Sequence, residues 1–111
     1  MDSQQEIQAE FEKAEAARAG GNEGRARVCA RRAAGIAVRE YMLRQGLRPQ
    51  SASAYDLLNT VKIDPQFSPQ LRDIADHLTL RVDEEFKLPV NADLIAEAKI
   101  FCKQLLKPEN P

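Results

Sequence analysis

Cysteine, histidine and aromatic residues are scarce in this 111-residue sequence. The two cysteines, Cys29 and Cys102, are too few for a disulfide framework or a four-cysteine metal site. Because no export signal is recognisable, we expect both thiols to be reduced and buried as small hydrophobic side chains. The one histidine, His77, excludes a histidine-cluster metal site and chemistry by several histidines of one chain. We therefore expect no metal and no cofactor.

Three further absences narrow the class of protein. No run of about 18 apolar residues is present, so no transmembrane helix is expected. The sequence begins Met-Asp-Ser-Gln-Gln-Glu, which is polar and acidic and lacks the apolar centre of a signal peptide. The glycine motifs of P-loop, dinucleotide-binding and α/β-hydrolase proteins are also missing. These absences predict a cytoplasmic protein that makes no contact with a membrane and is not a self-sufficient enzyme as a single chain.

The residues that are abundant favour helices. Hydrophobic residues make up 43% of the chain and charged residues 30%, so the composition is that of a folded protein with a core. Alanine, glutamate, arginine and leucine are frequent, whereas only 5 glycines and 6 prolines occur. A length of 111 residues suits one domain, because two separate cores would bury too little apolar surface. We expect a single all-α domain spanning residues 1–111, with its core at about 3–106.

Apolar residues recur at helical spacing in five segments. The first opens at Ser3, where Ser3 and Glu6 match a capping box, and ends at the Gly20-Gly21 pair. The others are expected at about 23–45, at about 53–61, from Pro69 through Val82 to a break at 86–89, and from Asn91 or Asp93 to Leu106. Short connections between helices place neighbours antiparallel, so the pattern predicts an up-and-down antiparallel bundle of four to five helices. No internal repeat is present, which disfavours a helical-repeat adaptor.

The second predicted helix has a face of small residues that lets a neighbouring helix approach closely. We expect this inner face to hold Ala26, Ala30, Ala33, Ala37 and Tyr41, with Val28, Cys29, Ile36 and Leu43 alongside.

Positive charge is concentrated in one part of the chain, although the net charge of the whole is −1. Residues 18–48 contain eight arginines and two glutamates, which gives this segment a net charge of +6 between two acidic segments. Arg25, Arg32 and Arg39 recur every seven residues and so form a stripe along one side of the second helix. Two interpretations stay open: the arginines pair with the acidic helices, or they bind phosphate or nucleic acid.

Across residues 6–106 the order of these features resembles the HEPN family of small helical-bundle proteins. The run from Glu15 to Ala34 is similar to the family's opening, in which a helix, a glycine-containing turn and a long alanine-rich helix follow one another. The segment Ala54-Tyr-Asp-Leu-Leu58 resembles its short helix with an aspartate-leucine pair. The run Arg81-Val-Asp-Glu-Glu-Phe, Pro89 and the helix from Asp93 resemble its closing section. The resemblance implies an HEPN-like bundle that binds nucleotide or RNA, or a nucleotidyltransferase partner protein encoded nearby.

The segment Arg72-Asp-Ile-Ala-Asp-His77 resembles the arginine–histidine motif of HEPN ribonucleases. For such members the motif implies metal-independent RNA cleavage, with His77 moving a proton and Arg72 stabilising charge on the phosphate. Asp73 would orient the His77 ring, and two chains related by a two-fold axis would share one cleft. A purely structural interpretation also stays open, because positions five apart lie about 140° apart around a helix. In that interpretation His77 lies between Asp73 and Arg81 and has no catalytic role.

Three hypotheses therefore follow from the sequence. The first is a homodimeric binding module for nucleotide, RNA or a nucleotidyltransferase partner, which uses Arg25, Arg32 and Arg39. The second is a dimeric, toxin-like RNA endonuclease that uses Arg72 and His77. The third is a helical scaffold or regulatory subunit without catalysis.

Overall fold

The computed structural model describes residues 2–81 and 92–107, and all regular structure in this part of the chain is helical. The helices are α1 (Ser3–Ala19), α2 (Glu23–Arg44), α3 (Ala54–Ile63), α4 (Pro69–Thr79) and α5 (Leu94–Leu105). This confirms the predicted all-α class and a helical bundle. The predicted break at 86–89, the end of the fourth apolar stripe at Val82 and the Asn91 alternative for the start of α5 lie outside the described residues.

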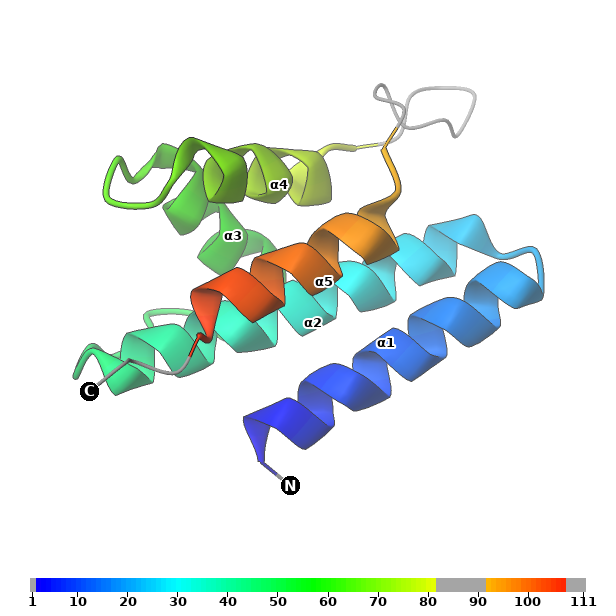
Figure 1. Cartoon of the computed structure of the whole chain (residues 1–111), viewed down its shortest axis with the longest axis horizontal. Coiled ribbons are helices and arrows are strands. Elements are labelled where there is room, and N and C mark those ends of the chain that lie inside the picture. Colours follow the sequence, from blue (N-terminus) through cyan, green and yellow to red (C-terminus); the bar gives the residue numbers. More distant parts are fainter. Residues whose placement is uncertain (1, 82–91, 108–111) are drawn as a thin grey trace.

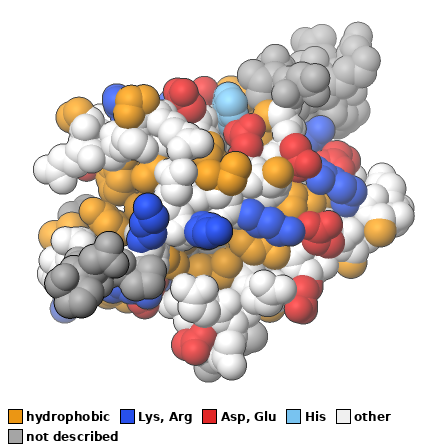
Figure 2. All heavy atoms as spheres, in the orientation of Figure 1, with side chains coloured by type: hydrophobic (Ala, Val, Ile, Leu, Met, Phe, Trp, Pro, Cys, Tyr) orange, Lys and Arg blue, Asp and Glu red, His pale blue; other side chains and the backbone are white. Residues whose placement is uncertain are grey.

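Helix α2 is the centre of the bundle, because it packs against each of the other four helices. Figure 1 shows α1 and α4 running in one direction and α2 and α5 in the opposite one, while the short α3 lies between α2 and α4 in the chain. Helix α5 lies across the front of α2 in this view, and α3 and α4 pack against each other above it. In Figure 2 hydrophobic atoms lie in the seams between helices and Lys or Arg side chains form a row over α5.

Local side-chain chemistry sets the helix boundaries. The oxygens of Asn22, Ser53, Ser68 and Asp93 each accept a hydrogen bond from a backbone N–H in the first turn of α2, α3, α4 and α5. The predicted capping box of α1 is displaced by one residue: Asp2, not Ser3, is the N-cap and pairs with Gln5, not Glu6. Helix α4 ends at Thr79, earlier than the apolar stripe predicts, because Leu80 adopts an extended conformation.

The core is formed by one connected set of apolar side chains from all five helices. Phe101 and Leu58 are its largest fully buried members, and the small residues of α2 allow the other helices to approach it. Ala26, Ala30, Ala33, Ala37 and Cys29 are buried as predicted, and Tyr41 and Ile36 pack against the core while partly exposed. Val28 and Leu43 are exposed, at 38% and 54%, so their predicted place on the inner face is wrong. Val28 lines an open space between α1, α2 and α3, so no described helix packs directly over it.

Candidate anion-binding groove

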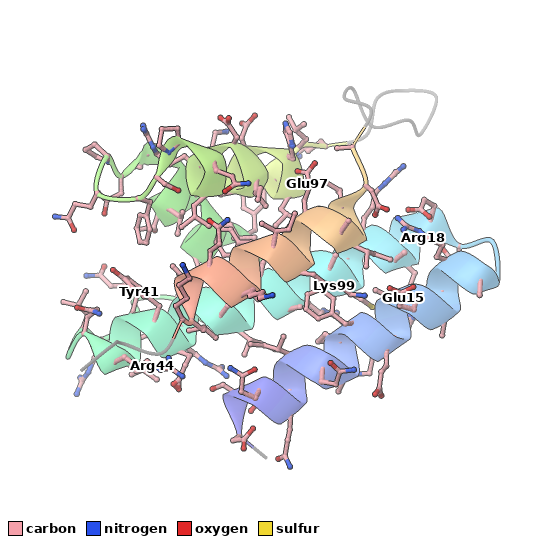
Figure 3. All side chains as sticks on the ribbon, in the orientation of Figure 1. Glu15, Arg18, Tyr41, Arg44, Glu97 and Lys99 are labelled. Atoms are coloured by element: carbon pink, nitrogen blue, oxygen red, sulfur yellow. The ribbon has the colours of Figure 1, made fainter. Side chains whose placement is uncertain are left out.

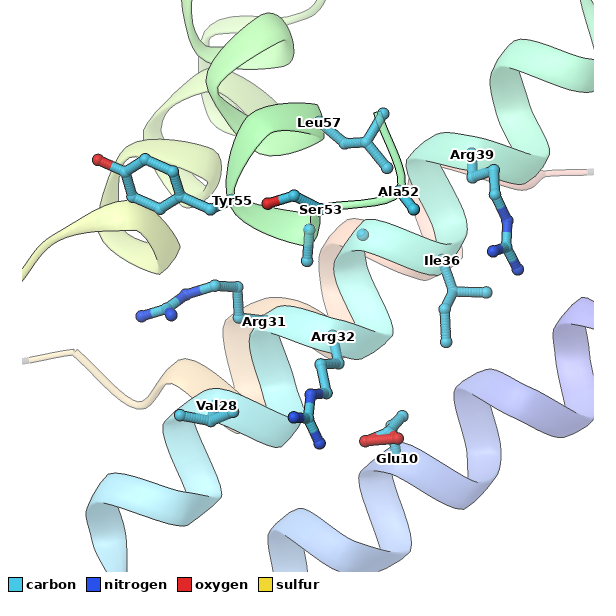
Figure 4. Close-up of a pocket in the computed structure, with 12 residues that line it drawn as sticks. Glu10, Val28, Arg31, Arg32, Ile36, Arg39, Ala52, Ser53, Tyr55 and Leu57 are labelled. Carbon is cyan, nitrogen blue, oxygen red and sulfur yellow. The ribbon is translucent and has the colours of Figure 1, made fainter. Parts of the chain in front are cut away.

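A groove of about 440 Å³ lies on the side of α2 that faces away from α5 (Figure 4). Its floor is α2, one wall is α1, and the other wall is the start of α3 together with the residues just before it. Three arginines of α2 line it, namely Arg31, Arg32 and Arg39. The other lining residues are Glu10, Val28, Gly35, Ile36, Ala52, Ser53, Ala54, Tyr55 and Leu57.

The three arginines differ in how far their charge is neutralised. Arg39 donates a hydrogen bond of 3.1 Å to the Glu6 carboxylate of α1, so part of its charge is compensated. Arg31 donates from Nε to the backbone oxygen of Leu78 in α4, at 2.8 Å, and is half-buried. Within residues 2–81 and 92–107, no carboxylate lies within ion-pair distance of Arg31 or Arg32.

Burial raises the energy of the Arg31 cation. Desolvation lowers the pKa of its guanidinium from the ordinary value, and among the described residues the nearby Tyr55 counteracts this effect. The backbone oxygen of Leu78 satisfies one N–H group but carries no full charge to balance the cation. An anion in the groove would therefore stabilise a charge that the described part of the fold leaves uncompensated.

The N-terminus of α3 forms part of the same wall. Ser53 is its N-cap, and residues 52–55 border the groove. A helix N-terminus carries about half a positive charge and attracts anions. The N-terminus of α3 therefore adds to the positive potential that the arginines create in the groove.

A second groove of about 620 Å³ adjoins the first and shares Val28, Arg31 and Tyr55 with it. It adds Arg27 and Arg81 to the arginines that face this side of the molecule. The Tyr55 ring lies where the two grooves meet and is 38% exposed. The nearby Asn59 and Arg81 side chains hold the pKa of its hydroxyl below the ordinary value.

The predicted arginine stripe is thus brought together only in part. Arg32 and Arg39 line the first groove, whereas Arg25 is exposed on α2 and lines neither groove. Sequence reasoning missed Arg27, Arg31 and Tyr55 as lining residues. The spacing of four residues between Arg27 and Arg31 was the available signal, since side chains four apart lie on the same face of a helix.

The predicted Arg72–His77 pair lies away from both grooves. His77 Nδ1 is 2.7 Å from Glu97 Oε1, which joins α4 to α5, and Figure 3 shows Glu97 on the side of α5 that faces α4. The residue that holds the His77 ring is therefore Glu97, whereas Asp73, predicted to orient it, is exposed. Arg72 is partly buried, and its Nε atom has no hydrogen-bond partner among the described residues.

The described residues contain no group of three His, Cys, Asp or Glu side chains that could hold a metal ion. No helix in the described ranges is both long and apolar enough to cross a bilayer.

Comparison with known proteins finds no matching family model, no matching curated protein and no matching solved structure. The geometry of the grooves is therefore the basis for a functional assignment.

Proposed function

We propose that the protein is a binding module for a phosphate-bearing ligand, a nucleotide or RNA, which it holds in the groove between α1, α2 and α3. The observation that carries the proposal is the set of Arg31, Arg32 and Arg39 around one concavity, of which only Arg39 is paired with a carboxylate in the described part of the chain. Guanidinium groups bind phosphate through paired N–H donors. HEPN-family resemblance in the sequence supports the same ligand class.

The shape of the site supports a ligand rather than a merely solvated basic face. A volume of about 440 Å³ lies in the range of small-molecule sites, and Val28 and Ile36 supply apolar floor between the arginines. The exposed Tyr55 ring at one end offers a surface on which a base can stack.

Calorimetric titration with pyrophosphate and fluorescence anisotropy with a labelled RNA oligonucleotide test the proposal. We expect Arg32→Gln to weaken both interactions about tenfold, as expected for the loss of a charged hydrogen bond. The double variant Arg31→Gln/Arg32→Gln should abolish them. Arg48→Gln, an exposed loop arginine outside both grooves, is the matched control. Binding by the double variant at wild-type strength would overturn the proposal.

RNA cleavage through His77 is the second candidate function, and one contact favours it. A carboxylate on Nδ1 fixes the orientation of a histidine ring and leaves Nε2 for proton transfer. Glu97 occupies this position.

The predicted homodimer and the predicted nucleotidyltransferase partner stay predictions. If the protein neither binds phosphate ligands nor cleaves RNA, the scaffold hypothesis is the one that survives.

A further inference from the structure

Glu10 of α1 is a buried acid on the wall of the arginine groove. Only 9% of the residue is exposed, although it belongs to a helix whose other carboxylates face solvent or are half-buried. Its two carboxylate oxygens differ. Oε2 lies 3.5 Å from Lys13 Nζ, whereas Oε1 is buried and has no hydrogen-bond partner among the described residues.

The carboxylate borders the same space as the arginines. Figure 4 shows the Glu10 side chain pointing from α1 towards α2, with Arg32 and Ile36 on the facing surface of α2. Arg32 nevertheless lies beyond ion-pair distance from Glu10, so the two side chains face each other across the groove without pairing. The groove therefore has cations on its floor, and its α1 wall contains one buried acceptor that lacks a donor.

A buried acceptor without a donor destabilises the protein, because it has lost its hydrogen bonds with water and has gained none in return. Inorganic phosphate and pyrophosphate relieve this cost poorly at neutral pH, because most of their oxygens are acceptors and Glu10 repels their negative charge. A ligand that carries an anionic group and also an N–H or O–H donor satisfies both parts of the groove. Nucleoside phosphates have this combination, because ribose hydroxyls and the amino groups of bases are donors.

We propose that Glu10 is a specificity-determining residue, which accepts a hydrogen bond from the sugar or base of a nucleoside phosphate while Arg31 and Arg32 bind its phosphate. This inference rests on the proposed function and narrows its ligand class: the groove prefers a nucleoside phosphate to an inorganic phosphate of equal charge, which lacks the sugar and base donors. Glu10 thereby disfavours bare anions and favours the complete nucleotide.

The test compares ADP, GDP and UDP with pyrophosphate by calorimetric titration of the wild-type protein and Glu10→Gln. The wild type should bind at least one nucleoside diphosphate about tenfold more tightly than pyrophosphate, as expected for one added hydrogen bond to a charged group. In Glu10→Gln the affinity for that nucleotide should fall, whereas the affinity for pyrophosphate should rise because a negative charge is lost. Glu12→Gln, an exposed position on the same helix, makes the same change in charge and should alter neither affinity by more than about twofold.

The opposite changes for the two ligands separate recognition from a structural or repulsive role. If Glu10→Gln strengthens or leaves unchanged the binding of both ligands, Glu10 only repels anions and the inference is wrong. The inference also fails if no nucleoside diphosphate binds the wild type better than pyrophosphate, although the proposed function then stands. Failure of the wild type to bind either kind of ligand would instead overturn the proposed function itself.

Discussion

Gly35 of α2 lies so close to Ala54 of α3 that there is no room for a side chain between them. A Cβ atom placed on Gly35 would lie 2.5 Å from the Cβ of Ala54 and 2.7 Å from its Cα. Both residues line the groove, so this crossing fixes the distance between its floor and its α3 wall. The site therefore depends on a glycine in the interior of a helix, a position where glycine itself is unfavourable.

Substitution of Gly35 by alanine should destabilise the protein. The added methyl group meets the Ala54 backbone, which cannot yield as a flexible side chain would, so α3 must shift. We expect a loss of about 1–3 kcal/mol in the free energy of unfolding, the usual cost of overpacking, measured by urea denaturation. Gly24→Ala is the matched control on the same helix, because its nearest neighbour would be 3.8 Å away. That variant should be as stable as the wild type or more stable, and an equal loss in both would contradict the packing argument.

Arg25 and Arg32 provide a direct comparison between the sequence pattern and the geometry. Both belong to the predicted stripe, but only Arg32 lines the groove. Arg32→Gln should therefore weaken phosphate-ligand binding about tenfold, whereas Arg25→Gln should weaken it only through a screened, longer-range effect of about twofold or less. Anisotropy titrations at two salt concentrations measure both. Equal losses in the two variants would mean that the whole stripe, rather than the groove, binds the ligand.

Much of the fold could be predicted from the sequence, because the helix boundaries depend on local side-chain chemistry. The caps Asn22, Ser53, Ser68 and Asp93 act within one turn, and the apolar stripe of α4 has the helical period. The groove could not be predicted in the same way. Its composition depends on which face of α2 the other helices leave open, and a seven-residue spacing selects Arg25 as readily as Arg32.

The His77–Glu97 contact shows that local sequence patterns could not predict the second candidate site either. These residues are 20 positions apart and belong to different helices, so no local spacing predicts that they meet. Asp73 lies one helical turn before His77 on the same helix, but proximity in sequence did not determine the partner of the ring. Long-range pairs of this kind follow only from the way in which α4 packs against α5.

Arg18 should make the stability of the protein depend on acid pH. It donates hydrogen bonds of 2.9 Å to Glu23 and Asp93, so it ties the turn between α1 and α2 to the start of α5. The hydrogen bond from Arg18 lowers the pKa of Glu23, and the backbone N–H of Ala96 together with Arg18 lowers the pKa of Asp93. A lowered pKa stabilises the fold above the unfolded-state pKa, and this stability is lost as the pH falls through the folded-state value.

The measurement is the urea stability of the wild type and Arg18→Gln between pH 7 and pH 3. All three side chains are partly exposed, so we expect a contribution of under about 1 kcal/mol at pH 7. The difference between the two proteins should shrink as the pH falls below about 4, where the carboxylates become protonated. Arg48→Gln should show no such trend. A constant difference across this pH range would exclude the ion pairs as its cause.

Cys102 should be an unreactive thiol in the native protein. Burial raises the pKa of its thiol to about 12, and its Sγ donates weakly to the backbone oxygen of Ala33. The thiolate is the reactive form, and at pH 8 almost none is present at this position. In a reaction with Ellman's reagent, we expect slow labelling of the native protein and rapid labelling of both thiols in guanidinium chloride. A Cys29→Ala variant, in which Cys102 is the only thiol, should keep this protection, and fast native labelling would show that the core opens there.

The pair His77 and Glu97 gives a sharp test of RNA cleavage. If Nε2 of His77 transfers a proton, His77→Ala should abolish cleavage of a labelled RNA. Glu97→Gln should reduce it, because the amide no longer offers two equivalent carboxylate oxygens to Nδ1 and holds the ring less firmly in one orientation. Asp73→Asn is the control that distinguishes the sequence-based partner from the one in the structure, and it should cleave as the wild type does. Cleavage that persists in His77→Ala would rule out this chemistry, and the pair would then serve to hold α4 against α5 through the 2.7 Å contact alone.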